Sequence, residues 1–291
     1  MMLRILVILL WAVPVHAATL VDMVGRPVEL PGPPRRIVSL APSLTEILFA
    51  LDAGDAVVGV TDFDDYPPEA GTKPSVGGGI DPNLEAIVAL RPDLVFVSAD
   101  ANQWGTISQL ERLHIPVFGV NPAGVEGVFE SIQKVGRVVG RERQAAALSA
   151  EMRRRMEAVS EKVSGRSRPK VLCAVWIDPL IVAGRGNVID DLIRMAGGIN
   201  IVERPGFPRY GLEAVFDNPP DVILLAVDRG GPGDGEALRR LPVWKELRAV
   251  REGAVRAIDA GVVNRPGPRI VTALELFARA LHHEAFEGSG P

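Results

Sequence analysis

The sequence predicts an α/β protein of two similar lobes, each with a mainly parallel sheet, joined by one long rigid α-helix. The first observation is a repeat: Leu-Glu-Ala-Ile at residues 84–87 returns as Leu-Glu-Ala-Val at residues 212–215, and at the same spacing each copy is followed by Pro-Asp and an apolar run. The second is the alternation of short apolar runs with helical patterns, which is typical of βα units. The third is an uninterrupted amphipathic stretch at residues 141–163. A repeated unit indicates two facing lobes, and ligands are commonly bound in such a cleft.

Length and composition indicate a globular protein. The chain has 291 residues, enough for two modest domains with real cores. Apolar residues make up 47% and charged residues 23%, which indicates neither disorder nor a membrane-embedded body. The net charge of −4 argues against nucleic acid as a partner, because phosphate binding needs a basic surface.

Residues 1–17 are expected to be a cleavable signal peptide. Arg4 provides a positive start, and the apolar segment 5–13 is too short to span a bilayer. Small residues then lead to Ala17 and Ala18, after one of which cleavage is expected. The alternative, a buried first helix, would require a polar face that segment 5–13 lacks. We therefore expect export to the periplasm.

Cys173 is the single cysteine of the chain, so no intramolecular disulfide can form. It lies far from the cleavage site and cannot be the lipidated first residue of a lipoprotein. Its position within an apolar strand pattern, residues 171–176, predicts a buried and inert thiol. We expect a freely soluble monomer.

The first lobe is predicted over residues 18–140. Its leader, residues 19–34, has a small hairpin as one interpretation. Short apolar runs then predict the strands of a parallel sheet, at residues 36–40, 56–60, 94–98 and 116–120.

Two helices of this lobe have start signals. Ser43 and Glu46 have the spacing of a capping box, in which the serine accepts an amide and the glutamate reaches back. Gly54 is well placed to end this helix. Asp81 and Pro82 predict the start of the next helix, with the aspartate as its cap.

Residues 141–163 predict a single helix between the lobes, because they contain neither proline nor glycine. Apolar residues recur on one face at intervals of three or four: Leu148, Met152, Met156, Val159 and Val163. Such a helix would be roughly 35 Å long at 1.5 Å per residue. Because one stiff rod replaces a flexible hinge, we expect the lobes to move little when a ligand binds.

The second lobe is predicted over residues 164–291 by the same patterns. Strands are expected at residues 170–176, 222–227 and 254–259, and helices at residues 188–196 and 271–282. Gly197 and Gly198 end the first of these helices.

Enzyme signatures are absent from the sequence. There is no G-x-S-x-G elbow and no P-loop, and the Gly-Arg-Gly at residues 184–186 lacks the third glycine of a dinucleotide fingerprint. The glycines of residues 230–235 are typical of a surface loop. Histidine is sparse, and His114 alone would be available to a bound metal. We expect no catalytic residues and no metal site.

Several segments resemble the periplasmic cobalamin-binding proteins. The resemblance rests on residues 41–46, 61–70, 84–93, 190–200 and 265–269, with the sequences APSLTE, TDFDDYPPEA, LEAIVALRPD, DDLIRMAGGIN and RPGPR. These proteins are class III periplasmic binding proteins, the receptors of ABC importers for vitamin B12, iron–siderophores and haem. The resemblance implies a non-enzymatic receptor without a resident cofactor. It would capture a corrinoid between its lobes and deliver it to an ABC permease, with its ATPase, at the inner membrane.

The resemblance also places ligand-binding residues along the cleft. Pro42 and Tyr66 lie in matching segments, and Tyr66 follows a predicted strand end, where a parallel sheet presents its binding edge. A flat ligand stacked on this ring would gain about 0.5–1.5 kcal/mol beyond burial. A half-buried packing tyrosine is the alternative. The opposite wall would be formed by Phe207, where the family carries a tryptophan, together with Tyr210.

The sequence departs from the family pattern at two positions. Gly79 replaces an expected tryptophan, and Gly261 replaces an expected aspartate. Trp104 and Trp176 could replace the lost aromatic surface, and filling the core is their alternative role. Arg265 would hydrogen-bond to amide or phosphate oxygens of the ligand, with a surface arginine in a proline-rich turn as the alternative. These departures leave corrinoid specificity open.

Glu85 and Glu213 occupy the same position in the two copies of the repeat. Each lies in the first turn of its predicted helix, where a carboxylate also suits the helix dipole. The resemblance implies more: the matched pair would project from the lobe tips and dock onto arginines of a two-fold permease.

The nearest rival is a haem or iron–siderophore receptor of the same class. Tyr66 and Tyr210 are the two tyrosines of the chain, and a phenolate can bind ferric iron. Arg204, Arg209 and Arg265 could pair with an anionic siderophore.

A rival from another class is a periplasmic hydrolase or chelatase that uses Asp62, Asp64 and Asp65. No nucleophile–base pair accompanies these aspartates in the sequence. They fit better as turn residues before Pro67.

Overall fold

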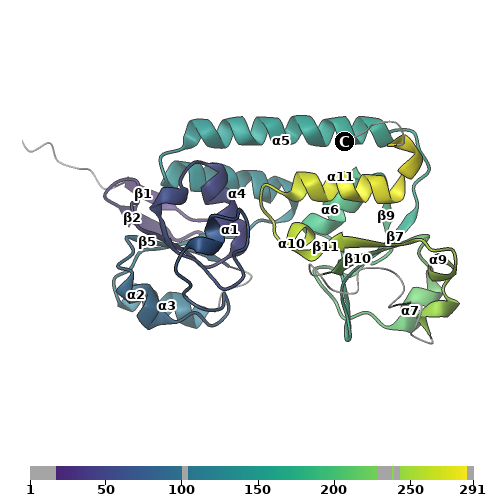
Figure 1. Cartoon of the computed structure of the whole chain (residues 1–291), viewed down its shortest axis with the longest axis horizontal. Helices are drawn as coiled ribbons and strands as arrows, with labels where there is room; N and C mark the ends of the chain where they lie inside the picture. The colour runs from purple at the N-terminus through teal and green to yellow at the C-terminus, as the bar shows by residue number, and fades with distance from the viewer. Residues whose placement is uncertain (1–17, 100–103, 228–237, 239–242, 287–291) are drawn as a thin grey trace, which may run out of the picture.

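The computed structural model describes residues 18–99, 104–227, 238 and 243–286. The expected signal peptide, residues 1–17, and the glycine cluster at residues 230–235 lie outside the described residues. Two lobes lie side by side beneath one long helix, as Figure 1 shows.

The first lobe begins with a hairpin of β1 (Ala18–Val21) and β2 (Pro27–Leu30), paired antiparallel. A four-stranded sheet follows in the order β4-β3-β5-β6, with every pair parallel. Its strands are β3 (Ile37–Ser39), β4 (Val57–Gly59), β5 (Leu94–Ser98) and β6 (Val117–Val120). The parallel sheet predicted for this lobe is confirmed.

Helices cover both faces of this sheet. They are α1 (Pro42–Ala50), α2 (Leu84–Ala89), α3 (Trp104–Arg112) and α4 (Gly124–Val138), with the 3₁₀ turns η1 (Gly54–Ala56) and η2 (Ala70–Thr72). Along β5, Leu94 and Phe96 join the core that α1 and α4 cover. Val95 and Val97 join the core on the other side, with Ile87 of α2 and residues of α3. Burial on both faces explains the continuous apolar runs of these strands.

The capping box predicted at Ser43 and Glu46 is wrong. The N-cap of α1 is Ala41, and no side chain caps the helix. Pro42 is at the start of the helix, where its fixed φ and missing N–H suit the first turn. Glu46 therefore lies inside the helix, where its buried carboxylate binds arginines from the other lobe.

The helix start predicted at Asp81 is also wrong. Asn83 is the N-cap of α2, and its side-chain oxygen accepts the Ala86 N–H at 3.0 Å. The backbone N–H of Asn83 donates to the carbonyl of Val76 at 2.8 Å. Together with the antiparallel bridge between Gly77 and Pro82, this bond closes a tight loop over residues 77–82, so the helix begins only after Asn83.

The helix that spans both lobes is α5 (Glu142–Val163), one residue shorter at its start than expected. It lies across the top of the molecule in Figure 1 and contacts α4 on one side and α11 on the other. Its buried stripe contains Ala145, Ser149, Met152, Met156, Val159 and Val163.

The second lobe contains a five-stranded sheet in the order β11-β10-β7-β8, with β9 beside β7. The strands are β7 (Lys170–Ile177), β8 (Leu180–Val182), β9 (Ile199–Asn200), β10 (Val222–Val227) and β11 (Val255–Asp259). β8 pairs antiparallel with β7, and the other pairs are parallel. The second sheet is mainly parallel, as predicted.

Helices also flank this sheet. They are α6 (Val188–Met195), α7 (Leu212–Asp217), α9 (Arg248–Arg251), α10 (Ala260–Val263) and α11 (Ile270–Leu281), with the 3₁₀ turns η3 (Trp244–Glu246) and η4 (His283–Ala285). Cys173 on β7 is buried, and burial raises the pKa of its thiol to about 12. The prediction of a buried Cys173 is confirmed.

One apolar cluster continues from lobe to lobe under α5. It includes Ile47 of α1, Ile132 of α4, Leu192 of α6 and Leu274 of α11. The lobes are therefore joined by a shared core as well as by the long helix. Among the described residues, no helix combines the length and the apolar character needed to cross a bilayer.

Candidate functional site

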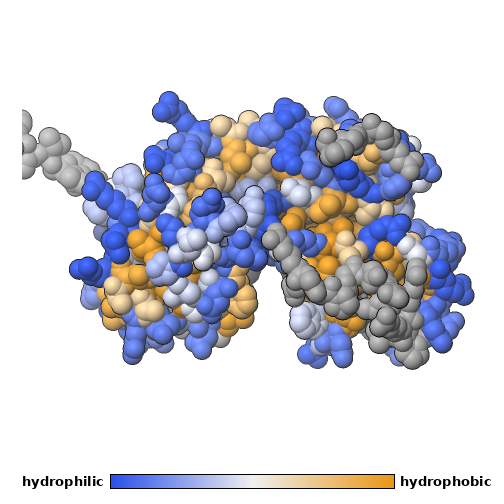
Figure 2. Space-filling model, in the orientation of Figure 1, coloured by the Kyte–Doolittle hydropathy of each residue, from blue (hydrophilic) through white to orange (hydrophobic). Residues whose placement is uncertain are grey.

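A hollow separates the lobes on the side away from α5, as Figure 2 shows. A pocket of about 550 Å³ has walls from both lobes, a volume typical of small-molecule sites. Its first-lobe wall contains Ser98, the last residue of β5, and Pro122, which follows β6. Its second-lobe wall is formed by Val175, Trp176, Ile181, Asn187, Val188, Ile189, Phe207, Val263, Asn264 and Pro266. The pocket thus lies where strand ends of both sheets meet, the usual ligand-binding edge of α/β proteins.

Two of the predicted ligand-binding residues, Trp176 and Phe207, line this pocket. Trp176 is 57% exposed and Phe207 is 55% exposed. The indole N–H of Trp176 donates to the carbonyl of Asp178 at 2.7 Å, which orients the ring. Large aromatic side chains left open to solvent in a cleft are suited to a flat, largely apolar ligand.

Tyr66 is 40% exposed and is not among the described residues that line this pocket. The guanidinium carbon of Arg269 lies 4.2 Å from the centre of the Tyr66 ring. One face of the ring is therefore covered by a cation from the second lobe, which stabilises the ring position.

Arg269 also binds a carboxylate that is almost completely buried. Glu46 is 3% exposed, and its Oε2 accepts the Nε–H of Arg269 at 2.9 Å. Its Oε1 accepts the Nη2–H of Arg269 at 2.5 Å. Burial raises the pKa of the Glu46 carboxyl, while hydrogen bonds and charge from Arg269, and charge from Arg265, act in the opposite direction. Two lobes are thus joined by a charge-assisted pair.

Arg265 extends this network. Its Nη1 lies 2.5 Å from Oδ1 of Asp65 and 3.5 Å from Oε1 of Glu46, and its Nη2 donates to the carbonyl of Phe63 at 3.0 Å. All three partners belong to the first lobe. These bonds engage at most three of the five guanidinium N–H donors. The ligand contact that the sequence suggested for Arg265 stays a prediction.

Gly261 shows how the chain accommodates the missing aspartate. Its carbonyl accepts the Nη2–H of Arg269 at 2.8 Å, and its N–H donates to Oδ1 of Asp259 at 2.8 Å. A Cβ at Gly261 would lie 3.0 Å from that same oxygen. Asp259, two residues earlier, is therefore the carboxylate beside this position.

Sequence reasoning missed the functions of Glu46 and Arg269. A signal was present, because Glu46 stands among the apolar residues of α1 and Arg269 follows Arg265 by four residues. A charged residue in a buried helix requires a partner, but the sequence does not identify it.

Two other predicted residues, Pro42 and Tyr210, are not among the described residues that line the pocket. Pro42 starts α1 and is partly buried. Tyr210 is partly buried and packs against the apolar core of the second lobe. Trp104 is the first residue of α3, and its side chain lies outside the described residues.

The three aspartates of the hydrolase alternative are engaged within the fold. Asp64 is buried, and its Oδ2 accepts the N–H of Thr61 at 2.9 Å and the hydroxyl of Thr61 at 2.5 Å. Burial raises the pKa of the Asp64 carboxyl, although hydrogen bonds from Thr45 and Thr61 oppose the rise. Asp62 accepts the hydroxyl of Ser75, and Asp65 pairs with Arg265. In the part of the chain that the structure describes, no group of three or more potential metal ligands is found.

Glu85 and Glu213 are both exposed, in the first turns of α2 and α7. The two helices lie at the ends of their lobes that point away from α5 (Figure 1). The matched glutamates are thus presented by the two lobes on the same side of the molecule.

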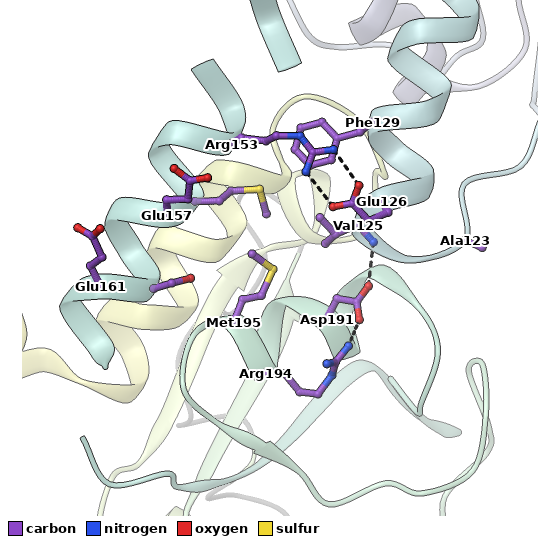
Figure 3. A pocket seen from close by; sticks show the side chains of 12 residues that line it. Ala123, Val125, Glu126, Phe129, Arg153, Glu157, Glu161, Asp191, Arg194 and Met195 are labelled. Carbon is purple, nitrogen blue, oxygen red and sulfur yellow. Dashed lines mark hydrogen bonds and ion pairs between the residues drawn. The ribbon is translucent and has the colours of Figure 1, made fainter. Parts of the chain in front are cut away.

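A second pocket, of about 520 Å³, lies between α4, α5 and α6 (Figure 3). Beside it, Oδ2 of Asp191 accepts the N–H of Val125 at 2.8 Å and so caps α4 from the other lobe. Glu126 forms a bidentate pair with Arg153 at 2.8 and 2.9 Å. These contacts hold α4 to α5 and α6, and they stabilise the joint between the lobes.

The periplasmic binding protein family matches residues 37–261. The chain is 31% identical over 289 residues to the uncharacterized ABC transporter substrate-binding lipoprotein YvrC of Bacillus subtilis, covering 94% of this chain and 88% of the relative. It is 32% identical over 273 residues to a cobalamin-binding protein of Halobacterium salinarum, covering 90% of this chain and 73% of the relative.

Solved structures with the same fold include two types of receptor. The periplasmic heme-binding protein RhuT from Roseiflexus is 29% identical, with a TM-score of 0.78 over 86% of this chain and 99% of that one. The periplasmic vitamin B12 binding protein BtuF of Vibrio cholerae is 26% identical, with a TM-score of 0.74 over 87% of this chain and 98% of that one.

Proposed function

Because the chain belongs to the periplasmic binding protein family, we propose that it captures a corrinoid of the cobalamin type and delivers it to an ABC importer. The ligand would lie in the pocket between the lobes, in the periplasm, after export by a cleavable signal peptide. The permease at the inner membrane, with its ATPase, would receive the ligand. The protein would act as a monomer, without catalysis and without a resident cofactor.

The exposed aromatic pair in the cleft, Trp176 and Phe207, is the observation that carries this proposal. A corrin ring is broad and flat, and its burial would stabilise the complex by about 25 cal/mol for each Å² of apolar surface removed from water. Asn264 adds a side-chain amide, which can donate hydrogen bonds to the amides at the edge of a corrin and accept hydrogen bonds from them. No protein group has to bind the cobalt. The cobalamin-binding relative supports the same ligand class.

Calorimetric titration of the purified mature protein with cyanocobalamin tests the proposal. We expect tight binding, weakened at least about 10-fold in Trp176→Ala and in Phe207→Ala, because each substitution removes an aromatic contact surface. Phe216→Ala is the matched control, since Phe216 is 40% exposed and lies outside the pocket lining. Absence of cyanocobalamin binding, with haemin or a ferric siderophore bound tightly, would move the assignment to the second candidate.

That second candidate is a haem or iron–siderophore receptor, and Tyr66 is the observation that favours it. Its ring is 40% exposed and lies beside the guanidinium of Arg269, which would stabilise a phenolate on ferric iron. The heme-binding structural neighbour supports this candidate. Titration with haemin followed by visible spectroscopy tests it: a tyrosinate-ligated spectrum that disappears in Tyr66→Phe would support haem over a corrinoid.

A further inference from the structure

The repeated segments contain a second matched pair besides the glutamates. Val88 and Phe216 occupy the same position in the two copies, each three residues after its glutamate. Val88 is 42% exposed and Phe216 is 40% exposed. Among the large apolar side chains exposed in the described parts of the chain, this is the one pair that the repeat relates.

The orientation of both helices is set by a buried residue at a matched position. Ile87 of α2 and Val215 of α7 are each 0% exposed and belong to the cores of their lobes. The residues immediately after them, Val88 and Phe216, therefore point away from the core. Since residues three apart share a helix face, each apolar side chain lies beside its glutamate. Each lobe tip presents the same arrangement of one carboxylate and one apolar side chain.

The ligand cleft does not account for these two side chains, because neither is among the described residues that line it. The lobe cores do not account for them either, since both are substantially exposed. Single exposed apolar residues are ordinary on a protein surface. The two apolar side chains occupy matching places, and each lies next to a glutamate that the family resemblance leads us to expect at the importer contact. This arrangement indicates a shared function.

The energetics of protein–protein docking indicate what that function is. Exposed ion pairs contribute little net affinity, although they accelerate encounter and orient the partners. Affinity at protein interfaces comes mainly from apolar side chains buried at the centre and surrounded by a polar rim. Glutamates alone would provide steering without a lasting complex.

We propose that Val88 and Phe216 are apolar anchors for the permease. Each would enter an apolar depression in one half of a two-fold partner, next to the cationic group that meets Glu85 or Glu213. This inference rests on the proposed function. In a symmetric partner the two depressions are identical, so each must be wide enough for the phenyl ring of Phe216. The depression that receives Val88 is then underfilled, and a larger side chain at that position strengthens docking.

Binding of the mature receptor to the reconstituted permease–ATPase complex of a corrinoid importer, measured by biolayer interferometry, tests the anchors. We expect Val88→Ala with Phe216→Ala to raise the dissociation constant about 10- to 30-fold, mainly through faster dissociation. Val88→Phe is expected to tighten binding several-fold. Glu85→Ala with Glu213→Ala should instead slow association, and this loss should shrink as salt is raised. Leu113→Ala removes another exposed apolar side chain, 51% exposed and outside the repeat, and should change nothing.

Calorimetry with cyanocobalamin on every variant separates docking from ligand capture and reports folding, and ligand affinity should be unchanged. If the double alanine variant at the anchors binds the importer as the wild type does, while the glutamate variant is impaired, the anchor inference is overturned and the docking role stands. A Val88→Phe variant that docks more weakly than the wild type would also overturn it. If the wild-type receptor binds no importer although it binds cyanocobalamin, the proposed delivery function fails, and the anchors fail with it.

Discussion

Glu46 and Arg269 form a bidentate ion pair between the two lobes, across 223 residues of sequence, with N–O distances of 2.9 and 2.5 Å. Glu46 lies within α1 of the first lobe, and Arg269 is the N-cap residue of α11 in the second. The side chains are 1% and 11% exposed. The same arginine covers the ring of Tyr66. The relative position of the lobes therefore depends on a buried polar network as well as on α5.

Removal of the carboxylate should destabilise the protein strongly. In Glu46→Ala, a largely buried guanidinium loses its partner, and we expect the free energy of unfolding to fall by about 3–5 kcal/mol. Urea unfolding followed by circular dichroism measures this loss. Arg154→Ala breaks the exposed pair with Glu151 and serves as the control, with no measurable change expected. Equal behaviour of the two variants would contradict a stabilising role for the buried pair.

His282 should make the protein less stable in acid. The residue is 7% exposed, and burial lowers the pKa of its imidazole below the usual 6.5. Hydrogen bonding to the backbone of Ala196 opposes this shift, and the nearby charge of Arg166 adds to it. As the pH falls through 6.5, the unfolded chain takes up a proton that the folded protein resists. Stability is therefore complete above pH 6.5 and is lost below it, by at most about 1.4 kcal/mol per pH unit.

Unfolding of His282→Gln as a function of pH checks this sign. We expect the difference in stability between wild type and variant to be constant above pH 6.5 and to shift in favour of the variant below it. A difference that stays constant down to pH 5 would show that His282 titrates normally.

Gly124 should resist substitution because of the joint between the lobes. Its φ is +65°, and a Cβ there would lie 2.5 Å from Oδ2 of Asp191, the oxygen that caps α4. Gly165 is the matched control, since its φ is +73° and a Cβ there meets nothing within 4 Å. Gly165→Ala should cost about 1–2 kcal/mol of backbone strain, and Gly124→Ala should cost more, because the cap is also lost. Thermal unfolding of both variants measures these two losses of stability. Equal losses would mean that the Asp191 contact contributes nothing to stability.

The matched glutamates should affect uptake without affecting capture. Glu85→Ala with Glu213→Ala is expected to impair solute uptake by cells and to leave the affinity for the ligand unchanged, because both carboxylates lie on exposed helix faces outside the cleft lining. Uptake of labelled cobalamin and calorimetry measure the two quantities. A parallel loss of ligand affinity would refute the docking role.

The lobes should move little on ligand binding. The shared apolar cluster under α5 and the buried pair of Glu46 and Arg269 both oppose a large rotation. Small-angle scattering of the free and cyanocobalamin-bound protein should give nearly the same radius of gyration. A clear contraction would indicate closure by domain rotation.

The sequence by itself determined the repeat, the parallel strands of both lobes and the extent of the long helix, but not the helices α3 and α4 or the short strands β8 and β9. These features depend on local patterns. Each of the four predicted strands of the first lobe overlaps an observed strand, and α5 differs from its expected range by one residue. Helix starts were less predictable. Asn83 caps α2 in place of Asp81, since its backbone bond to Val76 and the bridge between Gly77 and Pro82 hold Asp81 in a tight loop.

Only the tertiary structure decided which side chains meet. Glu46 has the spacing of a local cap, yet it binds Arg269 at the far end of the chain, because the apolar packing of α1 buries its carboxylate and a buried charge must find its partner. Trp176 and Phe207 line the cleft, whereas Tyr210 packs against the core. Nothing in the local sequence around these three aromatic residues separates the two outcomes. Local periodicity is encoded over a few residues, but the burial of a polar or aromatic group depends on segments that only folding brings together.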